Sequence, residues 1–301
     1  MARQPLAEVF GFPIDNFSPD AKRHRTRRLC PFNNKVPNCT KDKANDPLGV
    51  CSVYEGGRAV ITCPVRFREK WLIADDAADF FFPPDTRWTS LTEVRLTDNS
   101  GRSAGNIDVI LVAYEDTGRL LDFGALEVQS VYISGNVRRP FEHYMADPES
   151  QGHMDWTGQR FYPRPDYLSS SIKRLVPQLI YKGGILTKWR KKIAIAVDRP
   201  FFSTLPELPR TTCEDADTVL LVYDLVVYDL VHEASANLYT LARSETVYTL
   251  LAPALQRLTT LEPGPVESFV ERLQDKLDDK LSGAAPDTST LIEYLDGRDD
   301  I

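Results

Sequence analysis

The sequence lacks an apolar run approaching the ~20 residues that a membrane-spanning helix requires. Its start also lacks the basic segment and following apolar run of a secretory signal. We therefore expect a cytoplasmic protein that makes no membrane contact. Neither low-complexity tracts nor repeats of about 20–50 residues are visible, which argues against solenoids and long disordered linkers. Cysteine is scarce, with five in 301 residues, which argues against a disulfide scaffold.

Negative charge exceeds positive charge only at the C-terminal end. The net charge is -7, and residues 261–301 hold 11 Asp and Glu against 4 Lys and Arg, a balance that accounts for all of it. Residues 1–260 are therefore neutral overall. Their composition does not exclude a polyanionic partner such as nucleic acid.

Apolar periodicity predicts a mixed α/β core. Residues 106–114 form an apolar, β-branched run typical of a buried strand, and 120–133 return beside it after the turn 115–118. We further predict helices at 85–96, 166–180, 244–258 and 266–281, and strands at 192–197 and 218–228. Asp85 is the expected N-cap of the first helix. The apolar face of the helix 166–180 is expected to comprise Leu168, Ile172, Leu175, Val176 and Ile180.

Four cysteines cluster in the first 70 residues, a segment rich in turn formers and poor in periodic apolar runs. Cys30, Cys39, Cys51 and Cys63 are separated by 8, 11 and 11 residues. Four thiolates could close a tetrahedral zinc or iron site, since soft sulfur suits either ion. The alternative is four unconnected, partly buried thiols. A closed site leaves no position for substrate, so we expect it to hold loops in place in an N-terminal metal-binding subdomain over residues 1–72.

A group of polar residues interrupts the predicted strand pair. Asp108 lies in an apolar strand, where an unpaired carboxylate is costly. Glu127 and Gln129 are two residues apart on the returning strand and point to one face, and pairing about the turn brings Asp108 nearly opposite Glu127. This oxygen-rich set fits Mg²⁺ and hence phosphodiester hydrolysis, and Glu93 on the helix 85–96 could reach the same patch. The alternative is a pair of sheet-edge charges satisfied by arginine or water.

These residues carry a resemblance to a known nuclease motif. Asp108, eighteen further residues, and then Glu127-Val128-Gln129 are similar to the PD-(D/E)XK motif with glutamine in place of its final lysine. The segments IDVILV and ALEVQS, preceded by the four cysteines, resemble the NotI/EagI-like Type II restriction endonucleases of the PD-(D/E)XK nuclease superfamily. The similarity extends from about residue 5 to about residue 280 and includes PDYLSSSIKR and GPVESFVERL.

The resemblance implies a function and assigns roles. Asp108, Glu127 and Gln129 match the catalytic triplet, Glu93 matches an additional acidic residue, and the four cysteines match an iron site, which makes iron preferred over zinc. The family implies a prokaryotic homodimer that cuts both strands of a palindromic, G/C-rich DNA site with Mg²⁺ and leaves 5′ overhangs. The EagI-like pattern suggests the site CGGCCG. The implied endonuclease core covers residues 73–284, followed by an acidic tail at 285–301.

Polar and basic residues near the strand pair are candidates for DNA contacts, because a G/C palindrome is read through donors and acceptors in the major groove. They are Ser134, Asn136, Arg138 and Arg139 after the second strand, Ser169, Ser170, Ser171, Lys173 and Arg174 in the later helix, and Lys188 and Arg190 for phosphates. Each could instead be a solvated surface residue. Two rival functions remain open, a non-catalytic DNA-binding metalloprotein and a nonspecific or repair nuclease.

Overall fold

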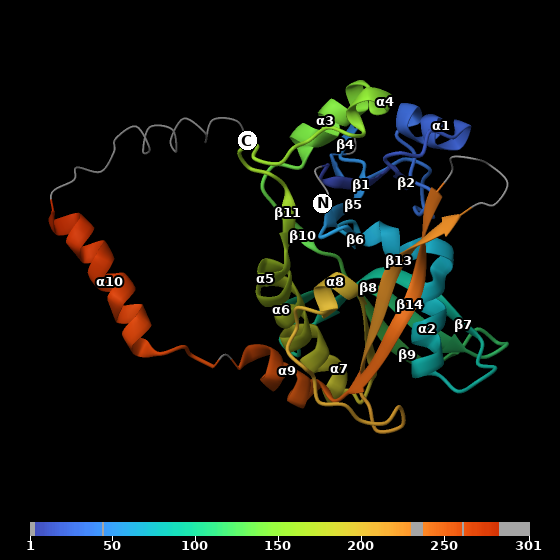
Figure 1. Cartoon of the computed structure of the whole chain (residues 1–301). Coiled ribbons are helices and arrows are strands. Elements are labelled where there is room, and N and C mark those ends of the chain that lie inside the picture. The colour runs from blue at the N-terminus through green and yellow to red at the C-terminus, as the bar shows by residue number, and fades with distance from the viewer. Residues whose placement is uncertain (1–3, 44, 230–236, 261, 283–301) are drawn as a thin grey trace. The chain divides into compact units, whose positions relative to one another are not determined.

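A computed structural model describes residues 4–43, 45–229, 237–260 and 262–282. The chain divides into two units, residues 1–259 and 260–301, which we describe separately. Within the described residues, the first unit contains a six-stranded mixed sheet in the order β14-β13-β12-β9-β8-β7 (Figure 1). Its strands are β7 (Trp88–Thr97), β8 (Ser103–Tyr114), β9 (Leu120–Gln129), β12 (Ile193–Asp198), β13 (Thr218–Asp229) and β14 (Asn237–Thr249).

The predicted strand pair lies within this sheet. β8 and β9 pair antiparallel, with Val109 opposite Leu126, and the Gly118 N–H donates to the Glu115 carbonyl (2.8 Å) in the turn between them. β7 pairs antiparallel with β8, β12 lies parallel to both β9 and β13, and β14 returns antiparallel to β13. β12 is buried along its whole length, as expected of a strand covered on both faces. The prediction of a mixed α/β core is confirmed.

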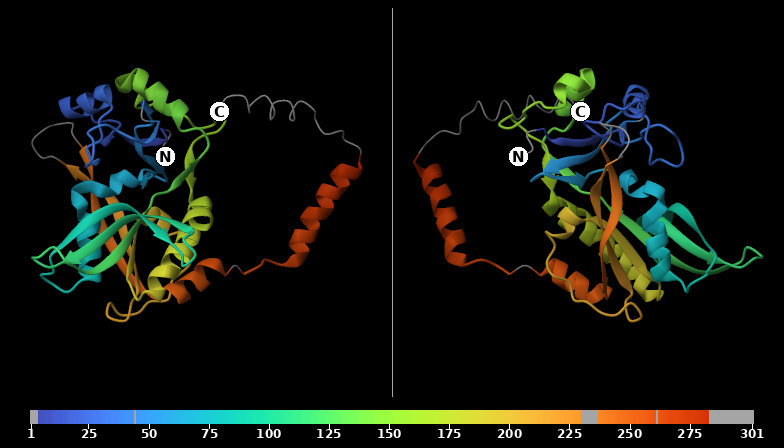
Figure 2. Two further views of the ribbon diagram at one scale, coloured as in Figure 1. Left: turned by 180° about the vertical axis from the view of Figure 1, so that it is seen from behind. Right: turned by 45° about the vertical axis from the view of Figure 1, so that its right-hand side comes forward.

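Helices cover both faces of the sheet (Figure 2). α2 (Leu72–Phe81) packs on one face against β9, β12 and β13, and buries Ile73, Ala77 and Phe81 there. A run of helical turns over 167–188 covers the other face together with α9 (Leu251–Thr259). The apolar side chains of the sheet therefore divide into two core clusters, one on each face.

The helical run alternates between α-helical and π-helical turns. It comprises α5 (Tyr167–Ser170), the π turn η2 (Ser171–Leu175), α6 (Val176–Gln178), the π turn η3 (Leu179–Gly183) and α7 (Gly184–Lys188). The predicted helix is confirmed, but its apolar face is partly wrong. Leu175 and Val176 are buried, whereas Leu168, Ile172 and Ile180 are exposed. The wider π turns redirect successive side chains, so a 3.6-residue period does not hold along the run.

The N-terminal residues form more regular structure than we predicted. A four-stranded sheet in the order β2-β1-β5-β6 comprises β1 (Leu6–Val9), β2 (Phe12–Pro13), β5 (Val50–Glu55) and β6 (Arg58–Ile61). Apolar residues of β1 and β5 are buried and join one core cluster of the large sheet, so the expectation of little burial is wrong. Such short strands, buried on both faces, lack the alternation that identifies a strand in sequence.

The connecting segments are short. In the N-terminal region they are α1 (Pro19–Arg27), β3 (Asp42–Lys43), β4 (Asp46–Pro47) and the 3₁₀ segment η1 (Pro64–Trp71). After β9 come β10 (Tyr132–Ser134), α3 (Arg138–Ala146), α4 (Pro148–Gln151) and β11 (Arg164–Asp166), and α8 (Arg199–Phe202) follows β12. β10 and β11 pair antiparallel in a separate two-stranded sheet, which holds the start of the helical run beside the end of β9.

Two predicted helices are wholly or partly strand. Within 85–96, the chain turns and enters β7, whose side chains alternate between exposed and half-buried, as on an edge strand. Threonine, valine and tryptophan favour this state, but the polar residues between them hid the two-residue period. Asp85 caps no helix and lies after α2 with a φ of 62°. Within 244–258, β14 continues to Thr249, and the helix is α9.

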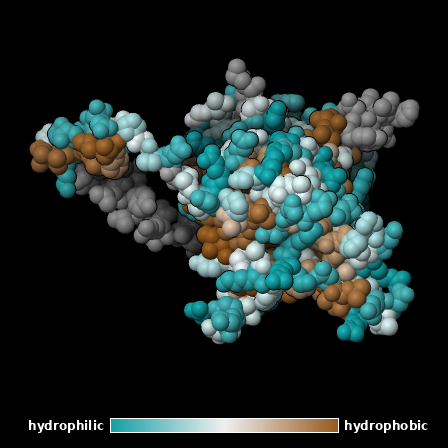
Figure 3. Space-filling view, turned by 90° about the horizontal axis from the view of Figure 1, so that it is seen from below, coloured by the Kyte–Doolittle hydropathy of each residue, from teal (hydrophilic) through white to brown (hydrophobic). Residues whose placement is uncertain are grey.

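The second unit contains α10 (Val266–Leu281), as predicted. Apolar and hydrophilic side chains of this helix gather in separate patches (Figure 3), and Phe269, Leu273 and Leu277 are exposed. The predicted acidic tail at 285–301 lies outside the described residues. In the part of the chain that the structure describes, no helix is long and apolar enough to cross a membrane.

Candidate active site and DNA interface

Asp108 and Glu127 stand side by side on neighbouring strands. Val109 of β8 pairs with Leu126 of β9, so the residues next to them, Asp108 and Glu127, face each other across the antiparallel pair. Asp108 is half-buried, and its Oδ2 accepts a hydrogen bond from the Val128 N–H (2.9 Å). The prediction that the turn brings these two carboxylates together is confirmed.

The Glu127 carboxylate is buried and held by a lysine. Its side chain is 1% exposed, and Nζ of Lys182 on η3 donates to Oε2 (2.8 Å) and Oε1 (3.0 Å). Burial raises the pKa of Glu127 to about 8, with a further contribution from the charge of Asp108 and an opposing one from the Lys182 ammonium. A cation bound between the two carboxylates would favour their ionised forms.

Gln129 lies two residues beyond Glu127 on β9. It is buried, and its Nε2 donates to the Ser130 carbonyl oxygen (2.7 Å). Its backbone pairs with Val197 of the central strand β12. The structure thus brings Asp108, Glu127 and Gln129 to one end of the strand pair, with the amide group of Gln129 fixed by its own neighbour.

Glu93 belongs to a strand rather than the predicted helix, yet it reaches the same region. Its neighbours on β7 pair with the neighbours of Asp108 on β8, so Glu93 stands across the strand pair from Asp108. Its φ of 57° is left-handed, which a non-glycine residue rarely adopts. Its exposed carboxylate pairs with Lys35, with Nζ 3.9 Å from Oε1.

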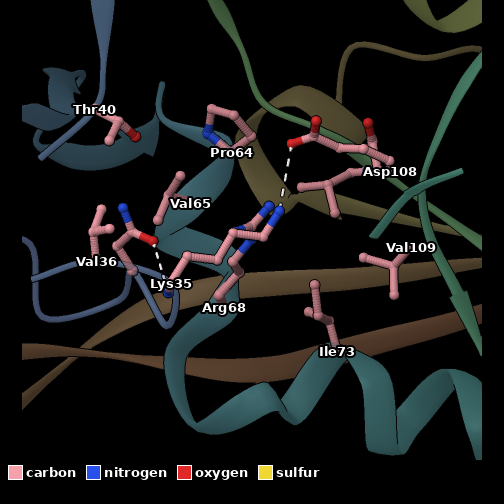
Figure 4. Close-up of a pocket in the computed structure, with 12 residues that line it drawn as sticks. Lys35, Val36, Thr40, Pro64, Val65, Arg68, Ile73, Asp108 and Val109 are labelled. Carbon is pink, nitrogen blue, oxygen red and sulfur yellow. Dashed lines mark hydrogen bonds and ion pairs between the residues drawn. The ribbon is translucent and has the colours of Figure 1, made fainter. Parts of the chain in front are cut away.

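A cavity of about 450 Å³ opens beside Asp108 and Glu93. The loop between Cys30 and Cys39 walls one side, η1 and α2 wall another, and the strands β7, β8 and β9 close the third. Figure 4 shows the side chains of Lys35 and Arg68 projecting into this space, with Asp108 at its far side. The cavity therefore combines carboxylates on one wall with cations on the other.

The four cysteines are brought together by two pairs of backbone contacts. The N–H of Cys30 donates to Pro37 (2.8 Å) and that of Cys39 to Arg28 (2.9 Å), while the N–H of Cys63 donates to the Cys51 carbonyl (3.2 Å). Burial raises the pKa of Cys30 to about 11, and backbone N–H groups of the following residues oppose this rise. The neighbouring thiols influence one another's pKa, as expected of groups in one cluster.

The donor types fit two different metal ions. Among the described residues, no three His, Cys, Asp or Glu side chains stand close enough to form a complete ligand set. Mg²⁺ needs fewer protein ligands, because one or two carboxylates commonly hold it together with waters and substrate phosphates. Asp108 and Glu127 therefore fit Mg²⁺. Four cysteine sulfurs, three of them buried, fit a softer ion such as iron or zinc in type.

The two segments predicted to contact DNA lie together at the end of β9. β10 pairs with β11, the Tyr132 N–H donates to the Ser170 hydroxyl (2.8 Å), and the Arg174 guanidinium lies 4.9 Å from the centre of the Tyr132 ring. The exposed members of the two segments are Asn136, Arg139, Lys173 and Arg174. They form a polar and basic surface that continues from the strand carrying Glu127 and Gln129.

Other candidates for DNA contact have internal partners. Ser170 is fully buried, and its hydroxyl donates to the Asp166 carbonyl (2.7 Å), which is a structural role. Arg138 forms ion pairs with Asp42 (2.5 Å) and Asp46 (2.7 Å). The remaining candidates are Ser134, whose hydroxyl donates to Arg164 (3.4 Å), the half-buried Ser169 and Ser171, and the exposed Lys188 and Arg190 at the other end of the helical run.

Comparison with known proteins gives a family. The model of the family described as Restriction endonuclease NotI matches residues 8–239, well over half of the chain. The chain belongs to this family. The comparison with curated proteins gave no match.

The match to the NotI family includes the four cysteines, Glu93, Asp108, Glu127 and Gln129, and it ends before α9 and α10. The resemblance seen in the sequence is confirmed at the level of this family. Its finer parts, the similarity to EagI and the placement in the PD-(D/E)XK superfamily, remain predictions.

Sequence reasoning missed three cations of this site, Lys35, Arg68 and Lys182. A signal existed for Lys182, because it follows the buried Leu175 and Leu179 at helical spacing, where an apolar residue is expected. Lys35 and Arg68 gave no such signal, since exposed cations occur throughout a protein surface. Only the fold of the N-terminal region brings them to the β8–β9 strand pair.

Proposed function

We propose that this chain is a Type II restriction endonuclease that cuts both strands of DNA by Mg²⁺-dependent phosphodiester hydrolysis. One observation carries the proposal: Asp108 and Glu127 face each other beside a cavity into which Lys35 and Arg68 project. Two carboxylates can bind a hard cation, and two basic side chains can hold the phosphate that is to be cleaved. Membership of the NotI family supports the same function.

The catalytic residues have distinct roles in this proposal. Asp108 and Glu127 would hold Mg²⁺, which when bound lowers the pKa of a water and stabilises the leaving oxygen. Gln129 orients the attacking water through its amide, since a neutral side chain cannot stabilise hydroxide by charge. Glu93 supplies a further carboxylate at the cavity, and its left-handed backbone is the kind of strain that functional sites retain.

The exposed surface beyond β9 is proposed to contact DNA. Asn136 and Arg139 would reach base edges or the backbone, and Lys173 and Arg174 would approach from the helical run. Lys188 and Arg190 would contact phosphates farther along. A palindromic site matches a two-fold symmetric protein, so we propose a homodimer acting on a G/C-rich palindrome, CGGCCG, with 5′ overhangs.

The four cysteines are proposed to hold a structural iron ion, with zinc as the alternative. The convergence of their thiols through backbone contacts supports this assignment. The ion would fix the loop between Cys30 and Cys39, which forms one wall of the cavity. Its role is therefore to shape the DNA-binding surface and not to take part in hydrolysis.

Incubation of plasmid DNA with the protein and Mg²⁺, followed by sequencing of the product ends, tests the proposal. We expect discrete fragments whose ends share one sequence and one 5′ overhang. Binding without scission would support a non-catalytic DNA-binding metalloprotein. Scission with heterogeneous ends would support a nonspecific or repair nuclease, and either result contradicts a restriction endonuclease.

A further inference from the structure

Lys182 is a charged residue in an apolar setting. Its side chain is 7% exposed, and both oxygens of Glu127 accept hydrogen bonds from its Nζ, at 2.8 and 3.0 Å. Among the residues that the structure describes, Lys182 is the one cation within ion-pair distance of Asp108 or Glu127. A buried ion pair of this kind rarely adds stability over an apolar pair of the same size, which favours a role other than packing.

The surroundings of Lys182 are shaped to admit it. It lies in the π turn η3, and π turns within helices occur frequently at functional sites. Gly105 of β8 has a φ of 102°, and a side chain there would place its Cβ 3.4 Å from the Cε of Lys182. On the following residue, Gly183, a Cβ would lie 3.0 Å from Leu251 of α9. The two glycines thus let the lysine stem lie against β8 and let the π turn lie against α9.

We infer that Lys182 is a positioning residue of the active site, which holds the Glu127 carboxylate in place for the metal and supplies the positive charge that Gln129 cannot. This inference rests on the proposed function. Two facing carboxylates repel each other, and a fixed ammonium on one of them offsets that repulsion without occupying the cavity side, where Asp108 is open. Lys182 acts through Glu127, because its contacts are to that carboxylate and it does not line the cavity.

Steady-state cleavage kinetics of the full chain test the inference. For Lys182→Gln, on a plasmid whose cut site has been mapped, we expect kcat to fall about 10- to 100-fold while KM for DNA stays within about twofold. Lys182→Arg should retain more activity than Lys182→Gln, since it preserves the charge. Moving the charge in the double variant Lys182→Gln/Gln129→Lys should recover part of the lost kcat, which a purely structural role of Lys182 would not produce.

The matched control is Lys192→Gln. Lys192 is also a half-buried lysine, and its Nζ donates to the Phe80 carbonyl (2.8 Å), away from the carboxylates. We expect wild-type kcat and KM for this variant. If Lys182→Gln does not fold, as judged by its thermal transition, Lys182→Met keeps the packing of the stem against Gly105 and takes its place.

Two results would overturn the inference. A folded Lys182→Gln or Lys182→Met variant with wild-type kcat removes any role of the lysine, and a fall in kcat that the charge-moving double variant does not relieve assigns it to the fold. Asp108→Asn, measured in parallel, separates this failure from that of the proposed function. If Asp108→Asn is inactive while Lys182→Gln is normal, only Lys182 is misassigned, whereas an active Asp108→Asn variant rejects the site itself.

Discussion

The Lys35 Nζ lies 3.9 Å from the Glu93 Oε1, which joins the loop between Cys30 and Cys39 to strand β7 across the candidate active site. Both side chains are more than half exposed. An exposed pair at this distance contributes at most about 1 kcal/mol to stability, so it is weak enough to open when a phosphate enters. The cysteine-bearing loop is thereby a wall of the site and a source of its positive charge.

Lys35→Gln should weaken DNA binding and leave the fold unchanged. A lysine that contacts a phosphate releases about one counterion, so we expect the slope of log binding constant against log salt to decrease by about one. The measurement is a salt titration of DNA binding in Ca²⁺. The control is Arg87→Gln, which removes another exposed ion pair, with Asp116 near the β8–β9 turn, and should leave the slope unchanged. An unaltered slope for Lys35→Gln would place Lys35 away from the DNA.

Removal of a cysteine-bound metal should weaken or broaden DNA recognition. Without the ion, the loop between Cys30 and Cys39 loses its anchor and Lys35 loses its defined position in the cavity. The measurement compares binding of cognate and non-cognate DNA in Ca²⁺ before and after chelation, with elemental analysis to establish metal loss. An unaffected ratio of the two affinities after verified loss would contradict a role in recognition.

Asp108→Asn should bind cognate DNA without cutting it. The amide removes one of the two carboxylates that would hold Mg²⁺, and a metal ion supplies several kcal/mol to such a reaction, so we expect cleavage to fall at least about 100-fold. Asp122→Asn is the control, because Asp122 lies on the same hairpin but pairs with Lys191 (2.5 Å). Nicking of plasmid by Asp108→Asn in Mg²⁺ at nearly the wild-type rate would exclude this site.

The facing of Asp108 and Glu127 could be predicted because it depends on local rules. A recognisable turn fixed the strand register, and alternation along β9 placed Glu127 and Gln129 on one face. The helical run was predictable as helix but not in its buried face, because the π turns that redirect Lys182 leave no signature in a 3.6-residue period.

The other misses arise from long-range contacts. β7 was assigned as helix because an edge strand with polar residues on both sides shows little alternation, and its strand state depends on pairing with β8. The N-terminal sheet was missed because β1 and β5 are buried by the large sheet, which their own sequence cannot reveal. Lys35 and Arg68 reach the cavity only through that tertiary packing.

Gln129→Lys should keep the fold and slow cleavage. The amide now donates to the Ser130 carbonyl, and a lysine would place a second ammonium near the Glu127 carboxylate that Lys182 already holds. We expect a lower kcat, with dependence on Mg²⁺ remaining absolute because a neutral amide leaves the pKa of the attacking water to the metal. The measurement is kcat and KM across Mg²⁺ concentrations. Unchanged kinetics would show that Gln129 does not position water.

Asp198 should make the protein less stable as pH rises. Its carboxylate is 1% exposed, accepts hydrogen bonds from the Ile61 N–H (2.9 Å) and the Phe201 N–H (3.2 Å), and has a pKa that burial raises to about 7. Below pH 4 it is protonated in the folded and unfolded states alike. Above that, the unfolded state ionises first, so the free energy of unfolding falls until the pH passes about 7, by on the order of 4 kcal/mol.

The variant Asp198→Asn isolates this effect, because an amide does not ionise. Urea unfolding between pH 5 and pH 8 should show wild-type stability decreasing relative to Asp198→Asn as pH rises. Asp147→Asn is the contrasting control. Asp147 also caps a helix, but hydrogen bonds from Ser150 lower its pKa, so its stabilisation is lost only at acid pH and its variant should run parallel to wild type above pH 5. Parallel curves for Asp198→Asn would mean that Asp198 titrates normally in the folded protein.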